Sequence, residues 1–341
     1  MNIERFFKTI QFILTNFIFY PIFAILIFMY MPRIAFEYKA KDINFSNIKE
    51  ETIAIIYDEF QDNDSHGFLV KDTFDKSLKI FKSKNKIHTI ILDSNKFKYD
   101  DLFYAIDHLG KDKKVYINIS FAPKGKIGRE YFAYMINKYA KENKNLKFFV
   151  AAGNREFLDK EQSLCLKKVN NSGIFDNYIK KQKTFNSLFY KSYSLYFIYR
   201  KATIFINNEK NINDEVMDFI RLNCDSNKSK LIYDSIEDFM FTSLLNPKTI
   251  KIIAGNDSFD LNNLQKDFVL KNIGLEKAIR LKEKNKNNFS VLDCPIDELQ
   301  NSNTRETSVY FIKKKDKIDW IVGTSISSPI NMAREISKRN K

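Results

Sequence analysis

The sequence is poor in the residue types that build disulfide scaffolds, tight turns and metal sites. Its 341 residues include 9 glycines, 6 prolines, 3 cysteines and 3 histidines. Cys165, Cys224 and Cys294 lack the spacing of metal ligands, and three cysteines cannot form a full disulfide framework. We interpret them as buried thiols.

Basic residues are abundant but form no dense cluster. A total of 56 lysines and arginines against 42 acidic residues gives a formal net charge of +14. Such a charge raises the hypothesis of a nucleic-acid-binding membrane protein. Because the lysines are scattered, we interpret them as solvated surface residues and expect no nucleic-acid partner. The hydrophobic fraction of 44% and charged fraction of 29% are typical of a folded chain, not a disordered one.

The chain begins with a long apolar stretch. Residues 10–31 are almost wholly apolar, and no charged residue lies between Lys8 and Arg33. As a helix this stretch would be about 33 Å long, enough to cross a bilayer core. A cleavable signal peptide needs a shorter apolar region and a suitably placed cleavage site, which are missing. We predict a short tail (1–9), one transmembrane helix (10–31) and a polar linker (32–50); basic residues on both sides leave the orientation open.

From residue 51 onward, apolar β-branched runs alternate with segments of helical spacing. Strands are expected at residues 52–57 (TIAIIY), 87–92 (IHTIIL), 115–120 (VYINIS) and 146–151 (LKFFVA). Helices are expected at residues 69–81, 100–109 and 129–142. This alternation predicts an α/β fold with a doubly wound, mostly parallel sheet and helices on both faces. In such sheets the residues that bind ligands or take part in catalysis lie at the carboxyl ends of the strands.

Four polar residues stand at such positions. Asp58 follows the first strand, and His66 lies in the next loop, where the following helix begins. Asn154 follows the fourth strand in AAGN, and Ser325 follows the apolar stretch 318–322 in GTSISSP. Taken singly, each has an ordinary explanation as a turn former or a helix cap. Their shared placement at strand ends points to one site.

In the order Asp, His, Asn, Ser, these residues resemble the subtilisin-like serine peptidases, the subtilase family. The most specific match is GTSISSP, followed by AAGN and by the His66-Gly67 pair. The resemblance covers residues 51–154 and 318–336. It implies a subtilisin-like catalytic domain over residues 51–341, with a long divergent insertion at about 155–317.

The resemblance also implies the roles of the site residues. Ser325 would be the nucleophile, His66 the general base, and Asp58 the carboxylate that orients His66. The Asn154 side chain and the Ser325 backbone N–H would form the oxyanion hole. Pro329 would lie in the first turn of the last helix, where its missing N–H loses no intrahelical bond.

Ser120, Phe121 and Ala122 stand where the family has its substrate-flanking strand, so the resemblance implies that they bind the substrate polypeptide. It implies serine-type endopeptidase activity without a cofactor or a metal ion. Together with the anchor, it predicts a single-pass protein of the cytoplasmic membrane, with its catalytic domain on the periplasmic or extracellular side.

The chain departs from the family pattern around Asp58 and His66, which lie only eight residues apart. Eight extended residues span up to about 26 Å, so contact between the two side chains is feasible. Asp62 and Asp64 lie in the same loop, but the end of a strand is the more rigid platform. The altered contexts motivate a second hypothesis, a catalytically degenerate subtilase-fold module that binds or scaffolds partners at the membrane.

Two further expectations concern the insertion. The aromatic-rich stretch 185–207 is expected to form strands or a hairpin packed on the sheet. The stretch 254–256 (AGN) is expected to be an ordinary junction between a strand and a turn, and not a second oxyanion site.

Overall fold

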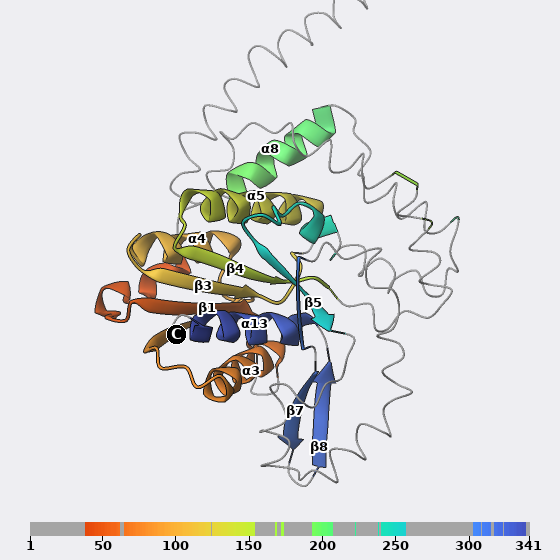
Figure 1. The fold of residues 1–341 in the computed structure, drawn as a ribbon. Helices are drawn as coiled ribbons and strands as arrows, with labels where there is room; N and C mark the ends of the chain where they lie inside the picture. The colour runs from red at the N-terminus through yellow and green to blue at the C-terminus, as the bar shows by residue number, and fades with distance from the viewer. Residues whose placement is uncertain are drawn as a thin grey trace, which may run out of the picture.

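The core of the protein is a parallel β-sheet of six strands. A computed structural model describes residues 38–61, 65–123, 125–153, 193–206, 240–256, 303–307, 309–314, 317–322 and 324–338, with a few isolated positions. The strand order is β2-β1-β3-β4-β5-β6, and every neighbouring pair is parallel (Figure 1). The strands are β1 (Thr52–Asp58), β2 (Ile87–Asp93), β3 (Lys114–Ile119), β4 (Leu146–Ala151), β5 (Lys251–Asn256) and β6 (Thr304–Thr307).

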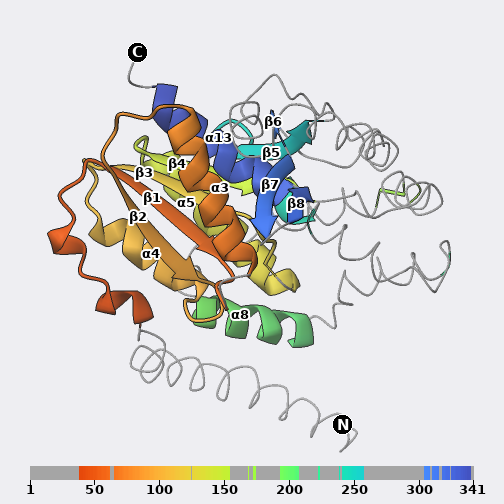
Figure 2. The ribbon, with the colours of Figure 1, turned by 90° about the horizontal axis from the view of Figure 1, so that it is seen from below.

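Helices cover both faces of this sheet, as Figures 1 and 2 show. On one face α3 (His66–Ile80) and α13 (Thr324–Lys338) lie side by side. On the other lie α4 (Tyr99–His108) and α5 (Lys126–Glu142), and α8 (Tyr193–Ile206) packs against α5. The predicted α/β class and the placement of helices on both faces are therefore confirmed.

Two smaller elements lie outside the sheet. An antiparallel hairpin is formed by β7 (Val309–Lys314) and β8 (Lys317–Val322), and it directly precedes α13 in the chain. The short 3-10 turns η2 (Lys39–Asp42) and η3 (Phe45–Asn47) precede β1, and η2 packs against α4.

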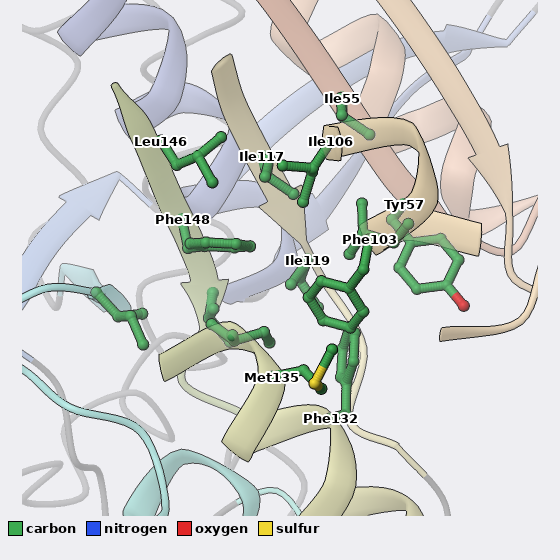
Figure 3. Packing of buried hydrophobic residues seen from close by; sticks show 14 of the residues in the cluster. Ile55, Tyr57, Phe103, Ile106, Ile117, Ile119, Phe132, Met135, Leu146 and Phe148 are labelled. Atoms are coloured by element: carbon green, nitrogen blue, oxygen red, sulfur yellow. The ribbon is translucent and has the colours of Figure 1, made fainter. Parts of the chain in front are cut away.

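The strands form because both of their faces are buried. In β1, Ile53, Ile55 and Tyr57 pack under α4 and α5, while Ala54 and Ile56 pack under α3 and α13. A strand covered on both sides can be apolar throughout, which explains the continuous runs in the sequence. Figure 3 shows the α4/α5 side, where Phe103 and Phe132 pack near Tyr57 and Ile119.

The four strands and three helices predicted before residue 152 are all present. Helices α3 and α5 each begin three residues earlier than expected, so that His66 is the first residue of α3. Residues 254–256 lie within strand β5, so the expected junction between a strand and a turn is wrong for this stretch.

The prediction for the aromatic stretch 185–207 is wrong over its described part, because residues 193–206 form helix α8. Aromatic and β-branched residues favour strands locally, but tertiary packing decides here. Tyr196 and Arg200 are one helical turn apart, and both are buried against α5. The Tyr196 hydroxyl donates to Glu130 Oε2 at 2.6 Å, and Arg200 Nε donates to the same oxygen at 3.1 Å.

The predicted transmembrane helix at residues 10–31 lies outside the described residues. Among the helices that the structure describes, none combines the length and apolarity required to cross a bilayer.

An ion-pair network joins α13 to the sheet. Glu335 of α13 accepts hydrogen bonds from Lys147 Nζ of β4 at 2.6 Å and from Lys251 Nζ of β5 at 3.1 Å. Burial by itself raises the pKa of Glu335, but the two lysines outweigh that effect and lower the pKa to about 2. The ionised carboxylate therefore stabilises the position of α13 above the sheet.

The stability of the fold should depend on Glu335 in a pH-dependent way. Because the folded-state pKa is lowered from 4.5 to about 2, the stabilisation is complete above pH 4.5 and is lost as pH falls toward 2. We expect Glu335→Gln to lower the free energy of unfolding at pH 7 by about 1 kcal/mol. Below about pH 2 the variant and the unmodified protein should converge. Urea unfolding followed by circular dichroism measures both effects.

Asp72→Asn is the matched control, since Asp72 pairs with Lys76 on the exposed surface of α3. Its loss should cost about 0.3–0.5 kcal/mol at most. Equal losses from the two substitutions would contradict a special role for the Glu335 network.

Candidate active site

Asp58 is the last residue of β1, the strand on whose two sides the next two strands of the chain are added. The chain adds β2 on one side of β1 and then β3 on the other, which creates a crevice at the carboxyl ends of these strands. The Asp58 side chain is fully buried there. One of its oxygens accepts the Glu59 backbone N–H at 2.7 Å. A buried carboxylate needs such partners because burial removes its hydration.

His66 provides the second partner. Its Nδ1 lies 3.0 and 3.1 Å from the two carboxylate oxygens of Asp58. The two side chains are therefore in contact across the eight-residue separation in sequence. With Nδ1–H donating to Asp58, the neutral imidazole has Nε2 as its acceptor nitrogen. The His66 side chain is 43% exposed.

Gly67 allows this short connection. The Gly67 N–H donates to the Glu59 carbonyl at 2.8 Å, which draws the start of α3 against the end of β1. A Cβ atom at Gly67 would lie 2.5 Å from that carbonyl oxygen and 2.8 Å from the ring of Phe60. Only glycine fits, which explains the His-Gly pair in the sequence.

The environment of His66 favours its protonated form. Burial lowers the pKa of His66, but the hydrogen bond and the charge of Asp58 outweigh it, so that the net pKa lies above 6.5. The carboxylate therefore both orients the ring and stabilises a positive charge on it.

Ser325 is the second residue of α13, at the carboxyl edge of the same sheet. The first four backbone N–H groups of a helix have no intrahelical acceptor, so the Ser325 N–H has no acceptor within α13. The helix dipole adds positive potential at this end. The Ser325 residue is 7% exposed.

Pro329 lies deeper in the helix than the sequence suggests. It is the sixth residue of α13, so the expectation that it occupies the first turn without loss is wrong. A residue with an N–H at this position would donate to the Ser325 carbonyl four residues earlier. In its place, the Ser120 hydroxyl donates to the Ser325 carbonyl at 3.1 Å.

A buried polar network extends from this bond. Asn118 of β3 donates from Nδ2 to Ser120 Oγ at 2.8 Å, and its Oδ1 accepts from the Ser328 hydroxyl at 2.7 Å. The Asn118 side chain is completely buried. The network therefore fastens the first turns of α13 to the end of β3.

The end of β4 is fastened to α13 as well. The Gly153 N–H bonds to Thr324 Oγ1 at 3.1 Å, and Gly153 has a positive φ of 98°. A Cβ at Gly153 would lie 2.6 Å from the Cβ of Asp238. The next residue, Asn154, lies outside the described residues, as does Gly323 before α13. Asn154 is thus adjacent in sequence to a position that contacts the start of α13.

Phe121 and Ala122, which come shortly after β3, line an apolar pocket. The pocket has a volume of about 620 Å³. Phe121 packs edge-on against Tyr57, with ring centroids 5.1 Å apart, and Ala122 lines the wall beside it. The full lining is Tyr57, Glu59, Ser94, Asn95, Phe97, Lys98, Tyr99, Phe121, Ala122, Pro123, Tyr193, Phe197 and Ile198. Phe121 and Ala122 can thus contact a ligand, whereas the Ser120 hydroxyl is used within the fold.

The structure brings the side chains of Asp58 and His66 into contact. It also places Ser325 at the same edge of the sheet, where the Ser120 hydroxyl binds the Ser325 carbonyl. Among the hydrogen bonds of the described residues, none joins Ser325 to His66. Asp62 and Asp64 lie outside the described residues. No group of three potential metal ligands occurs in the described part of the chain.

Sequence reasoning missed two residues that hold the site together, Asn118 and Thr324. Asn118 does carry a signal, because it is a polar residue inside the otherwise apolar run VYINIS. A buried amide needs hydrogen-bond partners, which indicates a structural or functional link. Thr324 has no comparable signal beyond its place in GTSISSP.

Comparisons with known proteins add no relative. Searches against models of protein families, curated proteins and solved structures found no match.

Replacing Asn118 should destabilise the fold. Asn118→Ala leaves the Ser328 and Ser120 hydroxyls without their buried partner, which should lower the free energy of unfolding by about 2–3 kcal/mol. Urea unfolding measures this loss. Asn145→Ala is the control, because Asn145 is exposed and its side chain donates to the Lys111 carbonyl at the surface. A loss of less than 1 kcal/mol for Asn118→Ala would contradict the network.

The titration of His66 tests the Asp58 contact. We expect NMR of the imidazole to show a pKa above 6.5, and Asp58→Asn to lower it, since the carboxylate raises it. The linkage has a definite sign, because the folded-state pKa is raised. The pair stabilises the fold fully below pH 6.5, and this contribution is lost as pH rises through the folded-state pKa. An unchanged His66 pKa in Asp58→Asn would refute the pairing.

Proposed function

We propose that this chain is a membrane-anchored, subtilisin-like serine endopeptidase. The observation that carries the proposal is the Asp58–His66 pair, with Nδ1 3.0 Å from the carboxylate, at the carboxyl edge of a parallel sheet. The same edge holds the first turn of α13 with Ser325. An Asp-His pair beside a serine at a helix N-terminus is the arrangement that acyl transfer by a serine nucleophile requires.

In the proposed reaction, Ser325 Oγ attacks the carbonyl carbon of a peptide bond, and its proton passes to His66 Nε2. Asp58 stabilises the resulting imidazolium through Nδ1. The C–N bond then breaks, the proton of His66 goes to the leaving amine, and an acyl-enzyme remains on Ser325. Water hydrolyses this ester by the reverse proton path, with His66 again acting as the base.

The negative charge of the tetrahedral intermediate needs donors. The Ser325 N–H is supplied by the free end of α13, and the side-chain amide of Asn154 is the proposed second donor. The positive end of the helix dipole acts in the same direction.

The substrate in this proposal is a polypeptide that extends along residues 120–122. Its side chains would enter the apolar pocket beside Phe121 and Ala122. The predicted helix at residues 10–31 would anchor the chain in the cytoplasmic membrane, with the catalytic domain on the periplasmic or extracellular side. No cofactor takes part in the proposed reaction.

A second candidate is a subtilase-fold module that has lost catalysis and acts as a tethered binding or scaffold protein. The missing hydrogen bond between Ser325 and His66 within the described residues favours it. The peptidase is compatible with the same observation, because catalytic hydrogen bonds are often long in ligand-free sites and shorten when substrate binds.

Labelling with a fluorophosphonate probe separates them. We expect the full chain to be labelled at Ser325, and the labelling rate to rise with pH through the raised pKa of His66, because only the neutral imidazole accepts the serine proton. Ser325→Ala should abolish labelling. His66→Ala should slow it by about 10³-fold or more.

His88→Ala is the matched histidine control, because His88 lies near the start of β2, at the opposite edge of the sheet, beside Glu50. It should label at the unmodified rate. A full chain that folds but stays unlabelled, or a His66→Ala variant that labels normally, would rule out the peptidase and leave the binding module.

A further inference from the structure

The segment before β1 is bound to the domain and does not act as a loose tether. The Tyr38 ring stacks on Tyr104 of α4, with centroids 4.8 Å apart. The Ala40 N–H donates to Asp101 Oδ1 of α4 at 2.9 Å, and Ala40 is completely buried. Figure 2 shows the red start of the coloured ribbon, which includes η2, next to α4.

The rest of this segment is held just as closely. Phe45 of η3 packs against the rings of Tyr104 and His108. Lys113 Nζ donates to the carbonyl oxygens of Ile48 and Glu50, both at 2.9 Å. Residues 38–50 therefore belong to the folded domain, and most of the polar linker has no freedom to extend.

The anchored end lies close to the rim of the pocket. The buried Asp101 carboxylate that binds Ala40 also accepts the Lys98 N–H at 2.7 Å, and Lys98 lines the pocket. Tyr104, the stacking partner of Tyr38, is five residues beyond Tyr99 of the pocket wall, about 8 Å along the helix. The chain thus enters the domain against the first six residues of α4, the helix that begins at the pocket wall.

Between the predicted membrane helix and Tyr38 lie only residues 32–37. Six residues span at most about 20 Å. A domain held at this distance through α4 cannot turn its pocket far from the bilayer.

We propose that the site acts on polypeptide segments within a few tens of ångströms of the membrane surface, such as the membrane-proximal parts of integral membrane proteins. This inference rests on the proposed peptidase function and on the predicted anchor. The docked segment 38–50 limits how far the site can lie from the membrane. Substrates farther from the membrane than this distance have an effective concentration near zero at the site.

The experiment uses the full chain reconstituted in liposomes with single-span reporters. Each reporter carries an unfolded casein segment, placed either directly after the span or beyond a helical spacer of about 50 residues, roughly 75 Å long. We expect the near reporter to be cleaved at least about tenfold faster than the far one. Cleavage of soluble casein measures the activity that does not depend on the distance between the substrate and the membrane.

A variant with a lengthened tether supplies the sharper test. Insertion of about 60 Gly/Ser residues between Glu37 and Tyr38 adds a root-mean-square span of roughly 40 Å. It should cleave the far reporter nearly as fast as the near one, with unchanged activity on soluble casein. The same insertion before Ile10 is the matched control, since it leaves the tether length unchanged, and it should keep the near preference.

The outcomes separate this inference from the function on which it rests. If neither soluble casein nor any reporter is cleaved, the peptidase fails and this inference falls with it. If soluble casein is cleaved but near and far reporters react equally in the unmodified chain, the inference alone is overturned. Failure of the chain to remain with the liposomes after alkaline washing would overturn the anchor and therefore the inference.

Discussion

The Ser120 hydroxyl replaces the hydrogen bond that Pro329 removes from α13, and the geometry of the site depends on this exchange. Inside a helix, a proline leaves the carbonyl four residues earlier without its usual donor. Here that carbonyl belongs to Ser325 and is bound by Ser120 from the end of β3. Asn118 completes the link by bonding both Ser120 and Ser328. The Ser325 carbonyl that Pro329 leaves without a helical donor is thus the group through which Ser120 holds the start of α13 at the edge of the sheet.

The buried charge of Asp58 determines the arrangement of Asp58 and His66 in the candidate site. Asp58 has no exposed surface, so its carboxylate is satisfied by the Glu59 N–H and by His66. Removing a partner of this buried carboxylate leaves its charge poorly compensated, which destabilises the folded state. The short loop from β1 to α3, held by the hydrogen bond from Gly67 to Glu59, therefore also fixes the position of His66. It holds the imidazole where the carboxylate needs it and raises its pKa.

The region predicted as an insertion contributes to the surroundings of the site. Helix α8 is fixed to α5 by the bonds of Tyr196 and Arg200 to Glu130, and its Tyr193 and Phe197 form one wall of the pocket. The segment before β1 is fixed to α4, whose first residue, Tyr99, lines the same pocket and contacts the Tyr193 ring edge-on. Elements far apart in the sequence thus build one apolar cavity around the end of β1.

The sequence alone determined the elements whose signals are local. Continuous apolar runs predict strands buried on both faces, and helical spacing predicts α3, α4 and α5, with errors of a few residues at their starts. Asp58 and His66 could be identified because they stand at the ends of such elements. For Ser325 the sequence supplied its place before the last helix, but not its contact with Ser120.

The tertiary structure decided what depends on distant contacts. Residues 193–206 form a helix because Tyr196 and Arg200 find a buried carboxylate on α5, although their composition favours a strand. Pro329 is tolerated in α13 because a hydroxyl 205 residues away from Ser325 in sequence replaces the lost donor. Local periodicity reports which face of an element is buried. It cannot report which partner satisfies a buried polar group, because that partner is chosen only when the chain folds.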